Sequence, residues 1–320
     1  MLWCSLLMLG LMLPPQDPAE DQEGGFRIGV AVDQVFLSVN ARSVEGGFVE
    51  GLRQDELEVF ENGVKQEIVN FYSQGVPVHV ALLIDISGST RNSQGEINRA
   101  ALGFASSLAP EDRVAVITFN HEPRLLLDWT NDREKVELAL QSTYAKGSTV
   151  LNDALYVAAD DLLSEVEGKR AIIVLTDGID TGSMSGGEEA LDSVVRSEAI
   201  VYVVSKLEEY WAAAIGARVQ LKGFTPREMS DSFILDARRF LGRLAAQTGG
   251  KVLIPGSSSL SDVYRQVADE LKRQYSISYI PSNVLKDGKW RTIEVRSKRR
   301  GVILGTRPGY YAPLEIPSGN

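Results

Sequence analysis

Short apolar runs and segments of helical periodicity alternate along residues 76–274. Runs that are apolar at nearly every position indicate strands buried on both faces, and they predict strands at 78–84, 113–119, 124–128, 170–176, 199–204 and 251–254. Apolar residues at helical spacing predict helices at 94–108, 131–141, 150–163, 187–197, 236–248 and 259–274. Because strands and helices alternate, we expect parallel βαβ units and an α/β fold with a doubly wound, mostly parallel sheet.

Both flanks of this region carry strand patterns instead. In residues 26–75, Asn62-Gly63 lies between two strand patterns and indicates a hairpin. In residues 275–314, Asp287-Gly288 is a second hairpin candidate. Neither flank is large enough to form a sandwich alone. We therefore predict that the two flanks pair into one β-sandwich-like domain, into which the α/β domain is inserted or by which it is flanked.

The stretch 206–233 interrupts the alternation of strands and helices. It contains the aromatic residues Tyr210, Trp211, Phe224 and Phe233 but few turn residues. We interpret it as an insertion after the fifth predicted strand, whose aromatic side chains either pack locally or form part of a partner surface.

Residues 1–25 differ from the rest of the chain. Leu2–Leu13 is almost wholly apolar, and Pro14–Pro18 ends the run. A run of this length fits a signal peptide better than a membrane span, although no Lys or Arg precedes it. We interpret 1–25 as a signal-like segment and linker. We expect an exported protein (periplasmic, cell-surface or secreted), with no integral membrane span after processing; a cytoplasmic location is the alternative.

One apolar run, Val80–Ile84, is followed by an acid and two hydroxyl residues at alternate positions: Asp85, Ser87 and Ser89. Alternation in an extended or looped backbone can aim three side-chain oxygens at one point. Hard oxygen donors of this kind suit a small divalent cation such as Mg²⁺. Taken alone, the same stretch is equally consistent with a turn and a helix N-cap.

Two further segments strengthen the metal interpretation. Thr149 precedes the predicted helix at 150–163, and Asp177 follows the predicted strand at 170–176. Taken alone, Thr149 is better explained as a helix cap and Asp177 as a strand-end turn. In an open parallel sheet, however, ligands gather outside the carboxyl ends of the strands. We therefore expect Asp85 and Asp177 to converge there, with Thr149 reaching in from the helix side.

Together these elements resemble the von Willebrand factor A (VWA) domain, also called the integrin I-like domain, over about residues 77–274. The order of segments in the whole chain also resembles bacterial VWFA-related domain proteins. The resemblance implies a metal-ion-dependent adhesion site that holds Mg²⁺, with Mn²⁺ or Ca²⁺ as alternatives. It also implies a partner protein that offers an Asp or Glu carboxylate to the cation. The positions that match the family's site are Asp85, Ser87, Ser89, Thr149 and Asp177.

Charge and motif content argue against other classes of function. The net charge is -10 at pH 7, whereas nucleic-acid binding calls for a basic face. Gly182–Gly186 reads G-S-M-S-G, which lacks the central serine of the G-x-S-x-G motif, and Ser185 lies well past the predicted strand and not on a strand-to-helix elbow. The only histidines, His79 and His121, are poorly placed to act as its base. We therefore expect a protein that is not an enzyme.

The sequence leaves three functions open. The favoured one is an exported, adhesion-type module that binds a protein through a metal. The first alternative is a VWA subunit or adaptor of an ATPase or chelatase complex. The second is a structural envelope protein whose metal only stabilises the fold. The apolar N-terminal run and the β-rich flanks favour the first.

Overall fold

The computed structural model describes residues 34–176, 178–205, 231–255 and 258–314, with side chains of 231–233 left undescribed. All of these residues belong to one unit, Asp33–Asn320. The interpretations of residues 1–25 and Asp177, and that of the aromatic insertion through Phe233, lie outside the described residues. Within the described ranges, no helix is long and apolar enough to cross a membrane.

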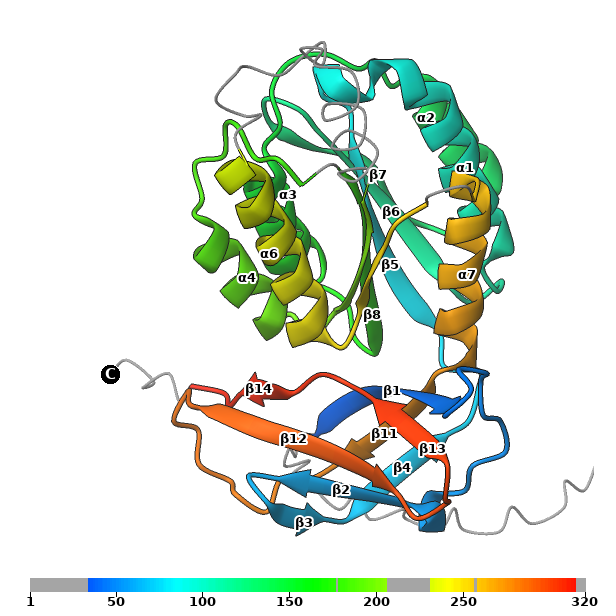
Figure 1. The fold of residues 1–320 in the computed structure, drawn as a ribbon, viewed down its shortest axis with the longest axis vertical. Helices are drawn as coiled ribbons and strands as arrows, with labels where there is room; N and C mark the ends of the chain where they lie inside the picture. Colours follow the sequence, from blue (N-terminus) through cyan, green and yellow to red (C-terminus); the bar gives the residue numbers. More distant parts are fainter. Residues whose placement is uncertain (1–33, 177, 206–230, 256–257, 315–320) are drawn as a thin grey trace, which may run out of the picture. The chain divides into compact units, whose positions relative to one another are not determined.

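Six strands form the central sheet (Figure 1), in the order β10 (Lys251–Leu253), β9 (Ile200–Ser205), β8 (Lys169–Thr176), β5 (Val78–Asp85), β6 (Arg113–Phe119) and β7 (Pro123–Thr130). All neighbours run parallel except β7, which pairs antiparallel with β6. The prediction of a doubly wound, mostly parallel sheet is therefore confirmed. Every predicted strand is present, with ends within two residues of their predicted positions.

Helices cover both faces of this sheet (Figure 1). One core packs the sheet against α1 (Gln94–Ser107), α2 (Arg133–Gln141) and α7 (Leu260–Arg273). The other packs it against α3 (Leu151–Val157, continued by a π turn at Ala158–Leu162), α4 (Gly187–Arg196) and α6 (Asp231–Thr248). Leu82 faces the first core and Leu83 the second. This alternation explains why β5 is apolar at consecutive positions.

The remaining strands form two antiparallel sheets, each with strands from both flanks of the α/β domain. One has the order β13 (Val302–Gly305), β1 (Val35–Ser43), β11 (Tyr275–Tyr279) and β4 (Ile68–Tyr72). The other has the order β14 (Gly309–Tyr311), β12 (Trp290–Ser297), β2 (Leu57–Glu61) and β3 (Val64–Gln66). Apolar residues of both sheets share one core. Short 3₁₀ turns span Gln54–Glu56 and Gly88–Ser93.

One predicted hairpin is present and the other is wrong. Asn62 and Gly63, both at positive φ, join β2 to β3 as a two-residue turn requires. By contrast, Asp287-Gly288 does not join two paired strands, because β11 and β12 lie in different sheets. Asp287 instead forms a bridge with Leu314. The Arg291 guanidinium donates to the carbonyl oxygens of residues 283 and 285, which fixes this segment as an irregular loop.

Candidate functional site

Asp85 is the last residue of β5, and its carboxylate is held in a fixed orientation. The side chain is buried. Its Oδ1 accepts a hydrogen bond from the backbone N–H of Ser87 at 2.9 Å, and its Oδ2 accepts one from Thr176 Oγ1 at 3.1 Å. Thr176 ends β8, the strand that pairs with β5. The carboxyl ends of two neighbouring parallel strands therefore meet at this acid.

Ser87 and Ser89 point their hydroxyl groups at one another, with 3.0 Å between the two Oγ atoms. Mg²⁺ binds six oxygens at 2.0–2.1 Å in an octahedron, so adjacent ligand oxygens are about 3.0 Å apart. Ser87 also precedes the 3₁₀ turn at Gly88–Ser93, but no cap hydrogen bond from its side chain is recorded among the described residues. The observed spacing therefore suits two neighbouring positions around a cation.

Thr149 lies in a loop that is hydrogen-bonded to both other segments of the site. Its N–H donates to Thr181 Oγ1 at 3.0 Å, and its carbonyl oxygen accepts from the N–H of Thr181 at 2.9 Å. Two residues earlier, the carbonyl of Gly147 accepts from the N–H of Gly88 at 3.1 Å. Backbone bonds thus connect the loop before α3 to the D-x-S-x-S segment and to the loop after β8.

The helix-cap interpretation of Thr149 does not hold. The N-cap position of α3 is Val150. The first N–H groups of the helix are bonded from another loop: Asn152 N–H donates to Asp180 Oδ2 at 2.9 Å, and Asp153 N–H donates to Ser183 Oγ at 3.1 Å. Capping of α3 therefore does not depend on the threonine hydroxyl.

Asp177 lies outside the described residues, but both of its neighbours are at the site. Thr176 donates to Asp85, and Gly178 N–H donates to Thr176 Oγ1 at 3.0 Å. Thr176 is a site residue that the sequence analysis missed. A hydroxyl residue at the end of a buried apolar strand was the available signal.

The other sequence candidates are not part of this cluster. Ser185 lies in the loop before α4, where its N–H donates to Asp153 Oδ1 at 2.8 Å. His79 lies in the second position of β5, at the opposite end of the strand from Asp85, and packs edge-on against Trp129. Burial, together with nearby Arg113 and Arg170, lowers the pKa of His79. Because Ser185 and His79 lie elsewhere, the described residues at the candidate metal site are Asp85 and residues with hydroxyl groups.

Among the described residues, no group of three or more His, Cys, Asp or Glu side chains is placed to hold a metal. A cation at this site would depend on hydroxyl oxygens together with few acids. Such a donor set suits a hard cation such as Mg²⁺, which binds oxygen ligands and retains several waters. The described side chains that fit this role are those of Asp85, Ser87 and Ser89, and Thr149 lies in the loop bonded to theirs.

Residues 80–179 match the family described as von Willebrand factor type A domain. This segment therefore resembles a VWA domain. It contains all five positions expected to hold the metal, most of β5, and the whole of β6, β7 and β8. The curated protein sll0103 of Synechocystis sp. (strain ATCC 27184 / PCC 6803 / Kazusa), described as uncharacterized, is 27% identical to this chain over 111 residues. The match covers 33% of this chain and only 26% of that protein.

Several solved structures resemble this chain. The von Willebrand factor type A protein from Catenulispora acidiphila is 16% identical, with 89% of this chain and 74% of that chain covered and a TM-score of 0.45. An aerotolerance-related membrane protein from Bacteroides fragilis NCTC 9343 is 18% identical, with coverage of 61% and 98% and a TM-score of 0.45. The vWF domain of the type V pili tip protein Mfa5 from Porphyromonas gingivalis is 23% identical, with coverage of 33% and 39% and a TM-score of 0.32.

Proposed function

We propose that this protein binds a partner protein through a divalent cation at the carboxyl ends of β5 and β8. Ser87, Ser89 and Thr149 would supply neutral oxygens, and Asp85 and Asp177 would supply negative charge directly or through water. The observation that carries the proposal is the 3.0 Å separation of the two serine hydroxyls beside a buried, oriented carboxylate. The VWA match over residues 80–179 supports a role in protein interaction.

The residues of this chain prepare the site before any partner arrives. The Ser87 N–H and the Thr176 hydroxyl fix both oxygens of Asp85. Backbone hydrogen bonds hold the loop of Thr149 against both other loops, so the donors need little rearrangement. When bound, Mg²⁺ would supply a positive charge and an open coordination position for a partner's Asp or Glu carboxylate.

The proposal describes a binding module that is exported and not an enzyme. The apolar run at Leu2–Leu13 supports export. The loop position of Ser185 and the distant position of His79 on β5 support a role other than hydrolysis. If Mg²⁺ joins the two proteins, a chelator would lower the affinity for the partner. If the metal has only a structural role, a chelator would lower stability and leave partner binding unchanged.

Calorimetric titration of Mg²⁺ into chelator-treated protein tests the metal site. Ser87→Ala is expected to weaken Mg²⁺ binding at least tenfold, which is about 1.4 kcal/mol. Ser164→Ala is the matched control, because Ser164 is exposed and lies after the π turn that continues α3. Equal Mg²⁺ affinity in both variants and the unmodified protein would contradict the proposed site.

Capture of partners from an extract, with Mg²⁺ or with chelator, then tests the function. A partner retained only with Mg²⁺, and lost in Ser87→Ala, supports the adhesion-type role. A metal that raises the melting temperature without changing partner capture supports the structural alternative instead. Mg²⁺-dependent capture of an ATPase or chelatase subunit supports the adaptor alternative.

A further inference from the structure

A cavity of about 90 Å³ lies away from the metal site, and its walls include both charged and apolar side chains. Three cationic residues line it: Lys169 and Arg170 at the start of β8, and Arg307 between β13 and β14. Phe36 and Ile277 are among its apolar walls. Since β8 carries Thr176 at its other end, this cavity is at the opposite edge of the sheet from the candidate metal site.

Arg307 is buried, yet much of its hydrogen-bonding capacity is unused. Its Nη2 donates to the carbonyl of Phe36 at 3.0 Å and pairs with Glu198 Oε1 at 2.9 Å. Its Nε and Nη1 have no hydrogen-bond partner among the described residues. A guanidinium remains charged in proteins and offers five N–H donors. Unpaired buried donors of a charged group cost free energy, so this arginine is poised to bind an acceptor.

Two hydroxyl groups that line the same cavity also lack hydrogen-bond partners among the described residues. Thr306 Oγ1 and Ser276 Oγ are buried, and neither has a hydrogen-bond partner within the described part of the chain. Both residues line the cavity beside Arg307. Buried polar groups in native proteins are usually paired with protein or water. Their concentration around one cavity therefore makes it suited to bind a ligand that accepts hydrogen bonds.

The charged residues that line the cavity favour a negatively charged ligand. Three cations line the cavity, whereas Glu198 is its one acidic lining residue among those described. Burial lowers the pKa of Lys169 to about 8, with Asp112 opposing this effect, and burial also lowers the pKa of Arg170. Both shifts arise mainly because burial disfavours the charged form of each side chain.

We propose that this cavity binds a small carboxylate anion. The carboxylate would accept hydrogen bonds from Arg307, Thr306 and Ser276, and a short alkyl group would lie against Phe36 and Ile277. A single water molecule needs about 10–15 Å³ of such cavity volume, so a cavity of about 90 Å³ has room for a molecule of the size of acetate or propionate.

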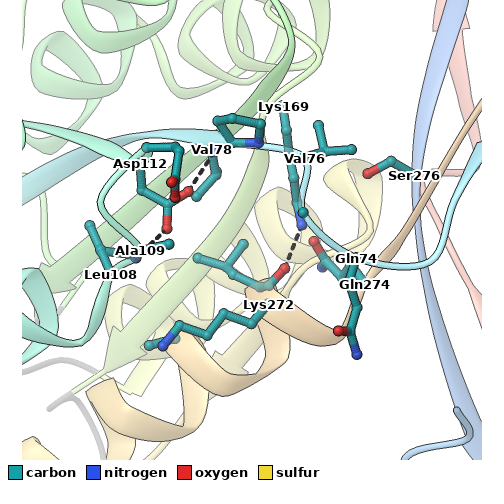
Figure 2. Close-up of a pocket in the computed structure, with 15 residues that line it drawn as sticks. Gln74, Val76, Val78, Leu108, Ala109, Asp112, Lys169, Lys272, Gln274 and Ser276 are labelled. Atoms are coloured by element: carbon teal, nitrogen blue, oxygen red, sulfur yellow. Dashed lines mark hydrogen bonds between the residues drawn. The ribbon is translucent and has the colours of Figure 1, made fainter.

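A second cavity of about 250 Å³ adjoins this one and shares Lys169 and Ser276 with it. Figure 2 shows this larger cavity, with the Lys169 ammonium group hydrogen-bonded to the backbone of α7. Gln274 also lines it, and its buried Oε1 has no partner among the described residues. Buried polar groups without a partner among the described residues therefore line both the anion cavity and the larger cavity beside it.

Thermal melting of the full chain in sodium propionate, against sodium chloride at equal ionic strength, tests the proposal. Chelator is present throughout, so a carboxylate cannot act through the metal site and the result does not depend on the proposed function. Propionate is expected to raise the melting temperature by about 3 °C or more in a saturable manner. Equal melting temperatures in the two salts would overturn the proposal.

Two variants locate the effect. Thr306→Val removes an unpaired buried hydroxyl while keeping the shape of the side chain, so the protein is expected to melt at the same or a higher temperature in chloride. Its affinity for propionate is expected to fall about tenfold. Arg307→Gln is expected to abolish the response, with Arg296→Gln, an exposed arginine paired to Glu294, as the control for charge. A full response to propionate in Thr306→Val and Arg307→Gln would show binding elsewhere and overturn the assignment.

Discussion

Thr176 Oγ1 donates a hydrogen bond to Asp85 Oδ2 at 3.1 Å, across 91 residues of sequence. The bond joins the carboxyl ends of β8 and β5. The same Oγ1 accepts from the N–H of Gly178, so the hydroxyl bridges an acid of the candidate site and the backbone of the loop after β8. Thr176 therefore positions Asp85 and is not itself expected to bind the metal.

Thr176→Val is expected to weaken Mg²⁺ binding about tenfold, as loss of a group that orients a metal ligand typically does. The variant also loses a buried hydrogen bond to a charged group, which stabilises a protein by about 1.5–3 kcal/mol. Thr248→Val is the matched control. Thr248 is buried too, and its Oγ1 accepts from the N–H of Val201 at 3.1 Å, near the start of β9.

Calorimetry and urea unfolding separate the two effects. Both threonine variants are expected to lose stability, but only Thr176→Val is expected to lose Mg²⁺ affinity. Equal Mg²⁺ affinity in the two variants would mean that Thr176 has only a structural role.

Lys169 makes the stability of the protein depend on pH. Burial lowers its pKa from 10.5 to about 8 in the folded chain. Between these two values the unfolded chain binds more protons, so the free energy of unfolding rises with pH. The cost of burying the ammonium group is fully present below about pH 8 and is lost above about pH 10.5. The difference in pKa corresponds to at most about 3 kcal/mol.

Urea unfolding of the unmodified protein and Lys169→Met, at several pH values from 7 to 10.5, measures this contribution. The stability of Lys169→Met relative to the unmodified protein is expected to fall by up to about 3 kcal/mol across the range. The comparison removes the contribution of other titrating groups, which both proteins share. A constant difference across the range would contradict a lowered pKa at Lys169.

The sequence predicted the central sheet well because its strands are buried on both faces. A run such as Val80–Ile84 has few alternatives to a central strand, and Asp85 then necessarily follows at the strand end. The wrong hairpin at Asp287-Gly288 shows the limit of local turn signals. Gly288 does have the positive φ of a turn residue, but β11 and β12 on either side of it pair with other strands in different sheets. The five-residue metal site stays a prediction.

The anion cavity could not be predicted from the sequence. Its polar groups at 169–170, 276 and 306–307 come from separate segments, and none belongs to a recognisable motif. Only the fold shows that Arg307 is buried with unused donors. Thr176 differs in that its position at the end of a buried apolar strand was visible in the sequence, whereas its hydrogen bond to Asp85 on another strand is visible only in the fold.

Glu61 is the centre of a buried polar cluster in the β domain. Its Oε2 accepts from Tyr279 at 2.8 Å and from Tyr310 at 2.9 Å, and its Oε1 pairs with Arg291 at 3.3 Å. Burial, and the hydrogen bond to Glu61, raise the pKa of both tyrosines. Both charged side chains are almost fully buried, and removal of Glu61 leaves Arg291 with Asp287, at 3.8 Å, as its remaining acidic partner among the described residues.

Glu61→Ala is therefore expected to lower the free energy of unfolding by about 3–5 kcal/mol. Glu58→Ala is the control on the same strand, because Glu58 pairs with an exposed lysine, Lys65. Exposed pairs contribute about 1 kcal/mol or less. Chemical denaturation of both variants measures the difference, and similar losses would show that the buried pair adds little.

Gly249 allows the turn after α6 to approach the segment that carries Arg307. Its φ is +75°, and a Cβ atom there would lie 2.6 Å from the backbone nitrogen of Arg307. Gly249→Ala therefore combines an unfavourable backbone conformation, which costs about 1–2 kcal/mol, with a clash against backbone.

Gly301→Ala is a close control: its φ is +74°, and its Cβ would have no neighbour within 4 Å. We expect Gly301→Ala to lose only the conformational contribution and Gly249→Ala to lose clearly more in chemical denaturation. Equal losses of stability would mean that the segment at residues 306–307 moves away at little cost. The melting temperature of Gly249→Ala in propionate would then show whether the anion cavity still binds its ligand after that movement.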